Sequence, residues 1–169
     1  MVDPGRIEQS LLNLVLNARD AMPNGGVLTI STRAIRNAEP LTVVSGEIPP
    51  GSYVALEVVD SGEGIDKTTL SRIFEPFFTT KGRGSGTGLG LAAVYSTVEQ
   101  SGGFLDVASE SNKGTAFTIY LPAVEGSRDL EKHELSDSEA VAAVGGEGRV
   151  LVVVPDPDIR EMLSQLLTS

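Results

Sequence analysis

Apolar residues recur along the chain with two different spacings, which predict helices and strands in turn. Spacings of three and four residues follow Asp3-Pro4 and predict a helix with Asp3 as its N-cap. A second stripe of this kind predicts a helix over 89–99. The apolar face of the first helix consists of Ile7, Leu11, Leu14, Val15, Ala18 and Met22. Alternation with a period of two predicts four strands: 27–35, 53–60, 104–110 and 115–121.

The connections between these elements complete the expected fold. Three prolines and two glycines make 36–52 a hairpin loop, and Asp66 can cap a short helix over 67–73. Residues 111–114 read as the turn between the last two strands. We therefore expect an α/β two-layer sandwich, with a mixed, mostly antiparallel sheet and helices on one face.

Composition changes at residue 123 and divides the chain into three parts. Residues 1–122 carry the periodic patterns, whereas 123–148 are acidic, weakly patterned and rich in Ala, Gly and Ser, as in a linker. Residues 149–169 contain one apolar strand-like run and one amphipathic helical pattern.

Charge and cysteine content narrow the function classes. The net charge of −10 argues against a general nucleic-acid binder. There is no cysteine, which excludes disulfides and fits a cytoplasmic location. No run approaches the roughly 20 apolar residues that cross a membrane, so we expect no membrane contact by this segment.

Asp60 is the first candidate for chemistry. It ends the apolar face formed by Val54, Leu56 and Val58, where a carboxylate needs a hydrogen-bond donor. Gly62 and Gly64 follow and permit close approach of the backbone to a flat ligand such as a purine. An alternative is that Asp60 only caps the next turn.

A second glycine-rich stretch strengthens the interpretation. Gly82, Gly84, Gly86, Gly88 and Gly90 alternate and lead directly into the helix predicted over 89–99. Bare backbone before a helix N-terminus favours anion binding. A flexible linker is the alternative, but the apolar stripe that follows argues against it.

Four motifs in order resemble the ATP-binding domain of sensor histidine kinases. Asn13 to Ala21 is similar to the asparagine box of that family, and Ile73 to Lys81 to its phenylalanine box. Asp60-Ser-Gly-Glu-Gly-Ile65 and Gly86-Thr-Gly-Leu-Gly-Leu91 resemble its two glycine boxes. The resemblance covers residues 3–122 and implies the Bergerat ATP-binding fold, with ATP and Mg²⁺ as ligands.

The resemblance also assigns roles to residues. It implies that Asp60 reads adenine, that Asn17 holds Mg²⁺ with support from Asn13, and that Thr87 and Lys81 contact phosphate. Asn17 and Lys81 would then be the catalytic residues. The remaining pocket positions implied by the boxes are Gly62, Gly64, Ile65, Gly86, Gly88, Leu89 and Gly90.

The segment 74–85 resembles a lid that ATP would order. Phe74, Phe77 and Phe78 would form a small apolar plug that positions Lys81, and with less support Arg83, over the phosphates.

The reaction implied is transfer of the γ-phosphoryl group to a histidine on dimerisation helices outside this chain. Hydrolysing members of the superfamily have a glutamate where this chain has Asn13, and an amide cannot act as a general base. This favours transfer over ATP hydrolysis. A nucleotide-sensing docking module and a serine kinase of the anti-sigma-factor type remain alternatives.

Residues 149–169 resemble the first strand and helix of a response-regulator receiver domain, which implies a hybrid kinase as the parent protein, with any membrane anchor outside this segment. The usual acidic pair is reduced here to Asp156. A strand and helix that simply pack on the ATP domain are the alternative. His133 resembles a phosphoacceptor only superficially, and we interpret it as an ordinary exposed histidine.

Overall fold

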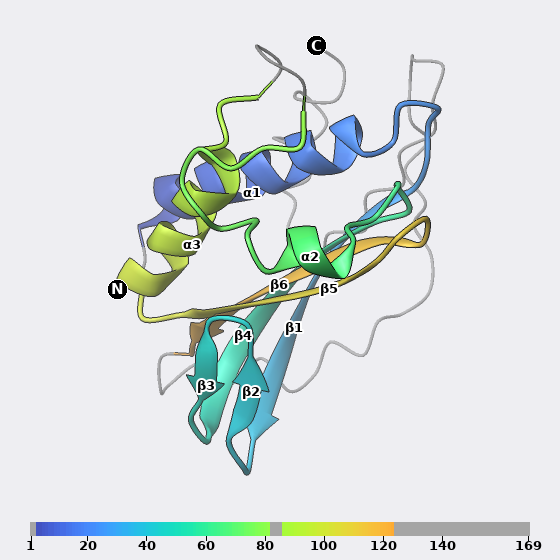
Figure 1. Ribbon diagram of the computed structural model, residues 1–169. Coiled ribbons are helices and arrows are strands. Elements are labelled where there is room, and N and C mark those ends of the chain that lie inside the picture. Colours follow the sequence, from blue (N-terminus) through green and yellow to red (C-terminus); the bar gives the residue numbers. More distant parts are fainter. Residues whose placement is uncertain (1–2, 82–85, 124–169) are drawn as a thin grey trace.

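The computed structural model describes residues 3–81 and 86–123 (Figure 1). The predictions for Arg83, Gly82 and Gly84, for the linker with His133, and for 149–169 lie outside these residues. The helices are α1 (Pro4–Asp20), α2 (Lys67–Leu70) and α3 (Gly90–Gln100). The strands are β1 (Leu28–Asn37), β2 (Leu41–Val43), β3 (Gly46–Ile48), β4 (Gly51–Asp60), β5 (Phe104–Glu110) and β6 (Gly114–Pro122).

Helix α1 begins where the sequence predicts. The Asp3 side chain accepts a hydrogen bond from the Gly5 N–H at 3.0 Å, and Pro4 occupies the first helical position. The predicted apolar face packs inward, with Leu11, Leu14 and Val15 buried. This packing presses α1 against the sheet and against α3.

The main sheet has four strands in the order β1-β4-β6-β5, and every pairing is antiparallel. In Figure 1, α1 and α3 lie together on one side of the sheet. Leu56 and Val58 of β4 join the helices in the main core. The expected α/β sandwich is therefore confirmed. Within 3–81 and 86–123, no helix has the length and apolar content to cross a membrane.

The segment predicted as a hairpin loop over 36–52 contains two short strands of its own, which form a second sheet, β2-β3. Val43 and Ile48 of this hairpin form a second small core with Tyr53 and Ala55. Tyr53 and Ala55 alternate along β4 with the residues of the main core, so this hairpin covers the other face of the sheet. Short strands of three residues between prolines give little periodicity, which explains why the sequence did not indicate them.

The turn of the hairpin also protects the edge strand β5. The Ser45 N–H donates to the Leu105 carbonyl at 3.1 Å, and the Leu105 N–H donates to the Ser45 hydroxyl at 2.8 Å. The backbone groups of Leu105 are therefore satisfied, which makes this part of the edge a poorer template for pairing with another chain.

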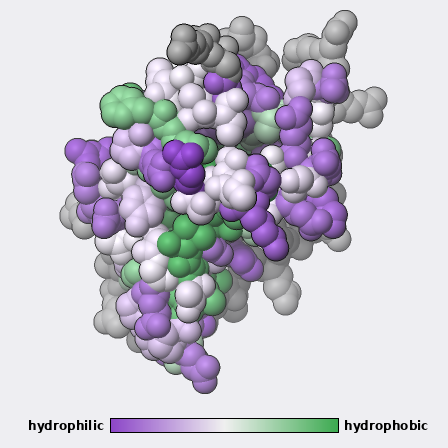
Figure 2. Space-filling model, in the orientation of Figure 1, coloured by the Kyte–Doolittle hydropathy of each residue, from purple (hydrophilic) through white to green (hydrophobic). Residues whose placement is uncertain are grey.

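A few large apolar side chains are exposed among the described residues. Figure 2 shows mostly hydrophilic and weakly polar side chains on the face in view, with separate hydrophobic areas between them. The exposed large hydrophobic residues are Leu16, Val27, Leu41, Val44, Phe77 and Leu89.

Candidate functional site

A cavity of about 790 Å³ lies between α1, the loop after β4, residues 78–81 and the start of α3. Its volume falls within the range of about 300–1,000 Å³ that is typical of small-molecule sites. Ten of the twelve predicted site residues line it: Asn13, Asn17, Asp60, Gly64, Ile65, Lys81, Gly86, Thr87, Gly88 and Gly90. The other two predicted residues, Gly62 and Leu89, do not.

Asp60 forms the buried side of the cavity. Its side chain is only 6% exposed, and its Oδ1 atom accepts a hydrogen bond from the Gly62 N–H at 2.8 Å. Burial raises the pKa of Asp60 above its ordinary value, although the N–H groups of Gly62 and Thr115 act in the opposite direction. Asp60 thus both caps its own turn and lines the cavity, which combines the two alternatives drawn from the sequence.

The first glycine loop is tied to its surroundings on both sides. The Glu63 N–H donates to the Ala21 carbonyl at 3.0 Å, and the Ile65 N–H donates to the Ser109 hydroxyl at 2.8 Å. Gly64 has a φ of +66°, and a Cβ atom there would overlap the carbonyl of Glu110. The loop is therefore held in place before any ligand binds.

Gly62 is not among the lining residues of the cavity and lies against the end of α1. A Cβ atom at this position would lie 2.5 Å from the Ala21 carbonyl oxygen at the end of α1. Gly62 thus permits the loop to approach the helix and does not itself contact the cavity. Leu89 caps α3 at its backbone with its side chain 43% exposed.

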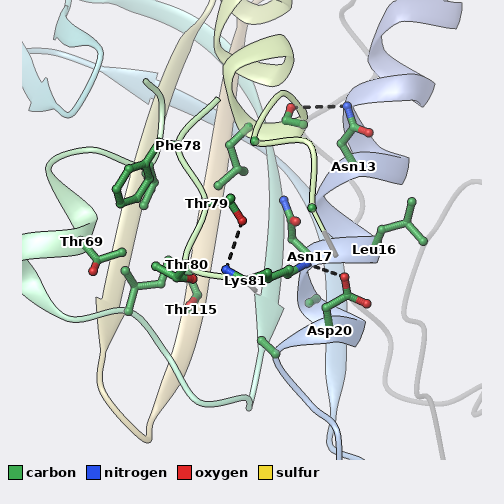
Figure 3. Close-up of a pocket in the computed structure, with 18 of the residues that line it drawn as sticks. Asn13, Leu16, Asn17, Asp20, Thr69, Phe78, Thr79, Thr80, Lys81 and Thr115 are labelled. Atoms are coloured by element: carbon green, nitrogen blue, oxygen red, sulfur yellow. Dashed lines mark hydrogen bonds and ion pairs between the residues drawn. The ribbon is translucent and has the colours of Figure 1, made fainter. Parts of the chain in front are cut away.

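Asn13 and Asn17 lie one turn apart on the face of α1 that borders the cavity (Figure 3). The Asn13 side chain donates to the Gly90 carbonyl at 3.4 Å and so connects α1 to the second glycine box. The Asn17 side chain makes no hydrogen bond within residues 3–81 and 86–123, so its amide oxygen can accept a ligand.

The start of α3 offers backbone donors. Leu89, its N-cap residue, provides no side-chain cap to the first N–H groups of the helix. Gly88 has a φ of +65° and its carbonyl accepts from the Phe77 N–H at 2.9 Å. A glycine turn before uncapped helical N–H groups is the arrangement that binds phosphate.

Lys81 is in the cavity wall but is not free. Its ammonium contacts Oδ2 of Asp20, the last residue of α1, at 2.5 Å, as Figure 3 shows. Lys81 also lowers the pKa of Asp20, and Arg19 adds to this effect. Asp20 was absent from the sequence prediction, although its position three residues after Asn17 places it on the same face of α1.

The three phenylalanines of the predicted plug have separate environments. Phe74 packs on Tyr95 with ring centroids 5.4 Å apart, and Phe78 lies under the Arg72 guanidinium at 4.4 Å. Phe77 is 74% exposed, so the expectation that it belongs to the plug is wrong. Its left-handed backbone, with φ at +67°, turns the side chain outward.

Thr115 is a further lining residue that the sequence did not indicate. It is 4% exposed and pairs across the sheet with Asp60. Its hydroxyl lies 2.9 Å from that of Ser109, which also holds the first glycine loop. Only the strand register, which no local pattern reveals, brings Thr115 beside Asp60. The other lining residues that were not predicted include Leu16, Glu63, Thr69, Thr79 and Thr80.

Comparison with known proteins agrees with this geometry. Residues 2–125 match the model of the histidine kinase-, DNA gyrase B- and HSP90-like ATPase family. The sensor kinase CckA of Brucella abortus is 42% identical over 94% of this chain and 17% of its own length. The sensor histidine kinase ZraS of Escherichia coli K12 is 43% identical over 71% of this chain and 22% of its own length. The chain thus spans about a fifth of the length of these relatives.

Solved structures give the same result for the fold. The catalytic domain of the histidine kinase ThkA, in a nucleotide-free form, superposes with a TM-score of 0.55 and 33% identity, over 72% of this chain and 68% of that one. The mycobacterial sensor histidine kinase MprB superposes with a TM-score of 0.52 and 31% identity, over 71% of this chain and 72% of that one. The chain therefore belongs to the histidine kinase-, DNA gyrase B- and HSP90-like ATPase family and contains the catalytic ATP-binding domain of a sensor histidine kinase.

Proposed function

We propose that this chain binds Mg·ATP in the cavity and transfers the γ-phosphoryl group to a histidine on the dimerisation helices of its parent sensor kinase. One observation carries the proposal. A buried carboxylate, Asp60, lines the same cavity as a lysine, Lys81, and the uncapped start of α3. This combination suits a ligand with a purine at one end and a polyphosphate at the other.

Asp60 is assigned to adenine recognition. Its carboxylate accepts one backbone N–H through Oδ1 and has capacity for a further donor, such as the exocyclic amine of adenine. The apolar side chains Ile65, Ile73 and Phe117 line the same cavity and suit the faces of the ring. Because Gly64 is held by its neighbours, the pocket needs little rearrangement to accept the base.

The phosphates are assigned to Lys81, Thr87 and the backbone of Gly86, Gly88 and Gly90. These groups lie along the cavity and include the only lysine among the described residues that line it. Leu89 occupies the N-cap position of α3, but its side chain makes no capping hydrogen bond and it does not line the cavity.

The residues present fit a magnesium ion. Mg²⁺ prefers oxygen ligands and is commonly held by one or two protein groups together with water and phosphate oxygens. The open amide oxygen of Asn17 supplies one such ligand. The described part of the chain has no cluster of three His, Cys, Asp or Glu side chains that could hold the ion without phosphate and water. When bound, the ion would offset the charge of the phosphates. Asn13 supports Asn17, because its hydrogen bond to the Gly90 carbonyl holds the face of α1 that carries both asparagines beside the start of α3.

Phosphoryl transfer then depends on positioning and charge neutralisation. The bond from the γ-phosphorus to the bridging oxygen breaks, a bond to an imidazole nitrogen forms, and ADP leaves. Asn17 and Lys81 are the catalytic residues in this scheme because they contact the transferred group or its counterion. A base that takes the imidazole proton would come from the helix that carries the acceptor.

We also propose that residues 149–169 form the first strand and helix of a receiver domain, as in a hybrid kinase, and that a response-regulator receiver outside this chain is a further partner. The longer span of the similarity to CckA, 94% of the chain against 71% for ZraS, supports a kinase-related origin for this region.

Titration calorimetry with Mg·ATP tests the assignment of the cavity. We expect the full chain to bind and Asp60→Asn to lose at least tenfold in affinity, because the amide keeps the shape but presents a donor to the adenine amine. Glu110→Gln is the matched control, since this exposed carboxylate pairs with Lys113 outside the cavity. Equal binding by Asp60→Asn and the unchanged chain would show that Asp60 does not read adenine.

Transfer is tested separately by adding the histidine-bearing helices of a related sensor kinase and labelled ATP. Label on a histidine would support the kinase. Binding without any transfer would favour the nucleotide-sensing docking module, and label on a serine would favour the serine kinase.

A further inference from the structure

The carboxylate of Asp20 lies between two cations at the mouth of the cavity. Oδ2 contacts the Lys81 ammonium at 2.5 Å, and Oδ1 accepts from Arg19 Nη2 at 2.9 Å. The Asp20 side chain is 32% exposed and that of Lys81 is 37% exposed, so the pair is only partly screened by water.

Helix stability does not account for this acid. Asp20 is the final residue of α1, where the partial negative charge of the helix dipole disfavours a carboxylate. Asp20 lines the cavity together with Asn13 and Asn17, at successive turns of the same helix face. Its position is therefore explained better by the cavity than by the helix.

The partner of Asp20 is the side chain that the phosphates need. Lys81 is the only lysine among the described lining residues, and it comes from a segment 61 positions away in the sequence. A phosphate group that binds Lys81 must compete with the Asp20 carboxylate for the same ammonium.

We propose that Asp20 is a specificity-determining residue that occupies Lys81 until a polyphosphate chain displaces it. This inference rests on the proposed role of the cavity as an ATP site. A nucleotide with a long phosphate chain breaks the Asp20–Lys81 pair and forms its own ion pair with Lys81. A nucleotide whose phosphate does not reach Lys81 leaves the Asp20–Lys81 pair intact. Asp20 thereby lowers the affinity for ATP without changing the affinity for the adenosine end.

The test is a double-mutant cycle by titration calorimetry on the full chain, with Mg·ATP and AMP as ligands. Asp20→Asn should bind Mg·ATP about two- to fivefold more tightly, the range expected for loss of a partly exposed ion pair. Its affinity for AMP should not change. In the Lys81→Met background, Asp20→Asn should have a smaller effect, because no ammonium remains to be released.

Two controls separate this role from a structural one. Glu110→Gln removes a lysine-paired carboxylate outside the cavity and should leave both affinities unchanged. Asp20→Ser repeats the neutralisation with a different side chain, and thermal unfolding checks that each variant is folded.

Three results would overturn the inference. The first is that Asp20→Asn binds Mg·ATP no more tightly than the unchanged chain. The second is that Asp20→Asn raises the affinity for AMP as much as the affinity for Mg·ATP. The third is that it raises the affinity for Mg·ATP by the same factor whether Lys81 is present or replaced by Met. If the unchanged chain binds no Mg·ATP, the proposed function fails and the inference fails with it. If the unchanged chain binds and only the Asp20 variants behave otherwise than expected, the proposed function stands and the inference alone is wrong.

Discussion

Phe77 combines an exposed aromatic ring with a backbone conformation that few side chains adopt. Its φ is +67° and its side chain is 74% exposed. A left-handed conformation at a residue other than glycine costs about 1–3 kcal/mol, and an exposed ring regains little of that by burial. The strain is tolerated because the Phe77 N–H donates to Gly88 and joins the phenylalanine box to the second glycine box.

We therefore expect Phe77→Gly to stabilise the folded chain by roughly 0.5–1 kcal/mol, after the larger chain entropy of glycine is subtracted. Urea unfolding measures the free energy of unfolding. Phe78→Gly is the control, because Phe78 is half-buried beside the core and its loss should destabilise the chain. A destabilised Phe77→Gly variant would mean that the exposed ring contributes to the fold.

Short sequence motifs, and the family resemblance that they carry, predicted most of the residues that line the cavity. Asp60 at the end of an apolar strand and the asparagines on α1 are local patterns, and both lie in the cavity. The Asp20–Lys81 pair was not predictable, because either residue alone reads as a solvated charge and 61 positions separate them. Phe77 was misplaced because its direction depends on a φ angle that the sequence does not reveal.

At the scale of elements, the first glycine loop is defined by its contact with the end of α1. Gly62 approaches the helix so closely that a Cβ atom would lie 2.5 Å from the Ala21 carbonyl oxygen. The same carbonyl oxygen accepts a hydrogen bond from the Glu63 N–H, which holds the loop against the helix. The loop is therefore anchored to the end of the helix that also carries Asn17.

Gly62→Ala should accordingly destabilise the chain by about 1–3 kcal/mol, the typical cost of forcing an extra carbon into a packed site. The effect should appear in the free energy of unfolding, measured by urea. Gly5→Ala is the matched control, since its Cβ atom would meet only an ordinary contact of 3.6 Å near the start of the same helix. If Gly62→Ala has the same free energy of unfolding as Gly5→Ala, the loop and the helix are not coupled at Gly62.

At the scale of the whole molecule, the fold places one acid with a shifted pKa, Asp60, against the core and another, Asp20, at the mouth of the cavity. Burial raises the pKa of Asp60, whereas the Lys81 hydrogen bond lowers the pKa of Asp20, both relative to 3.8. The two carboxylates therefore influence stability with opposite signs. The folded state binds an extra proton at Asp60, so this residue makes stability fall as pH rises from 3.8 through the raised pKa. Asp20 makes stability fall as pH drops below 3.8.

Nucleotide binding should reverse the shift at Asp60, because an adenine amine that donates to the carboxylate favours its charged form. We expect Mg·ATP to release a fraction of a proton from the chain at a pH between 3.8 and the raised pKa of Asp60. Calorimetry in two buffers of different ionisation enthalpy measures this release. The release should fade at pH values above the raised pKa of Asp60, where the carboxylate is already ionised. AMP should produce it as well, because the effect belongs to the adenine end. Proton uptake in place of release would mean that the ligand meets Asp60 in its protonated form, with the carboxyl group as donor, and the assigned direction of the adenine contact would then be wrong.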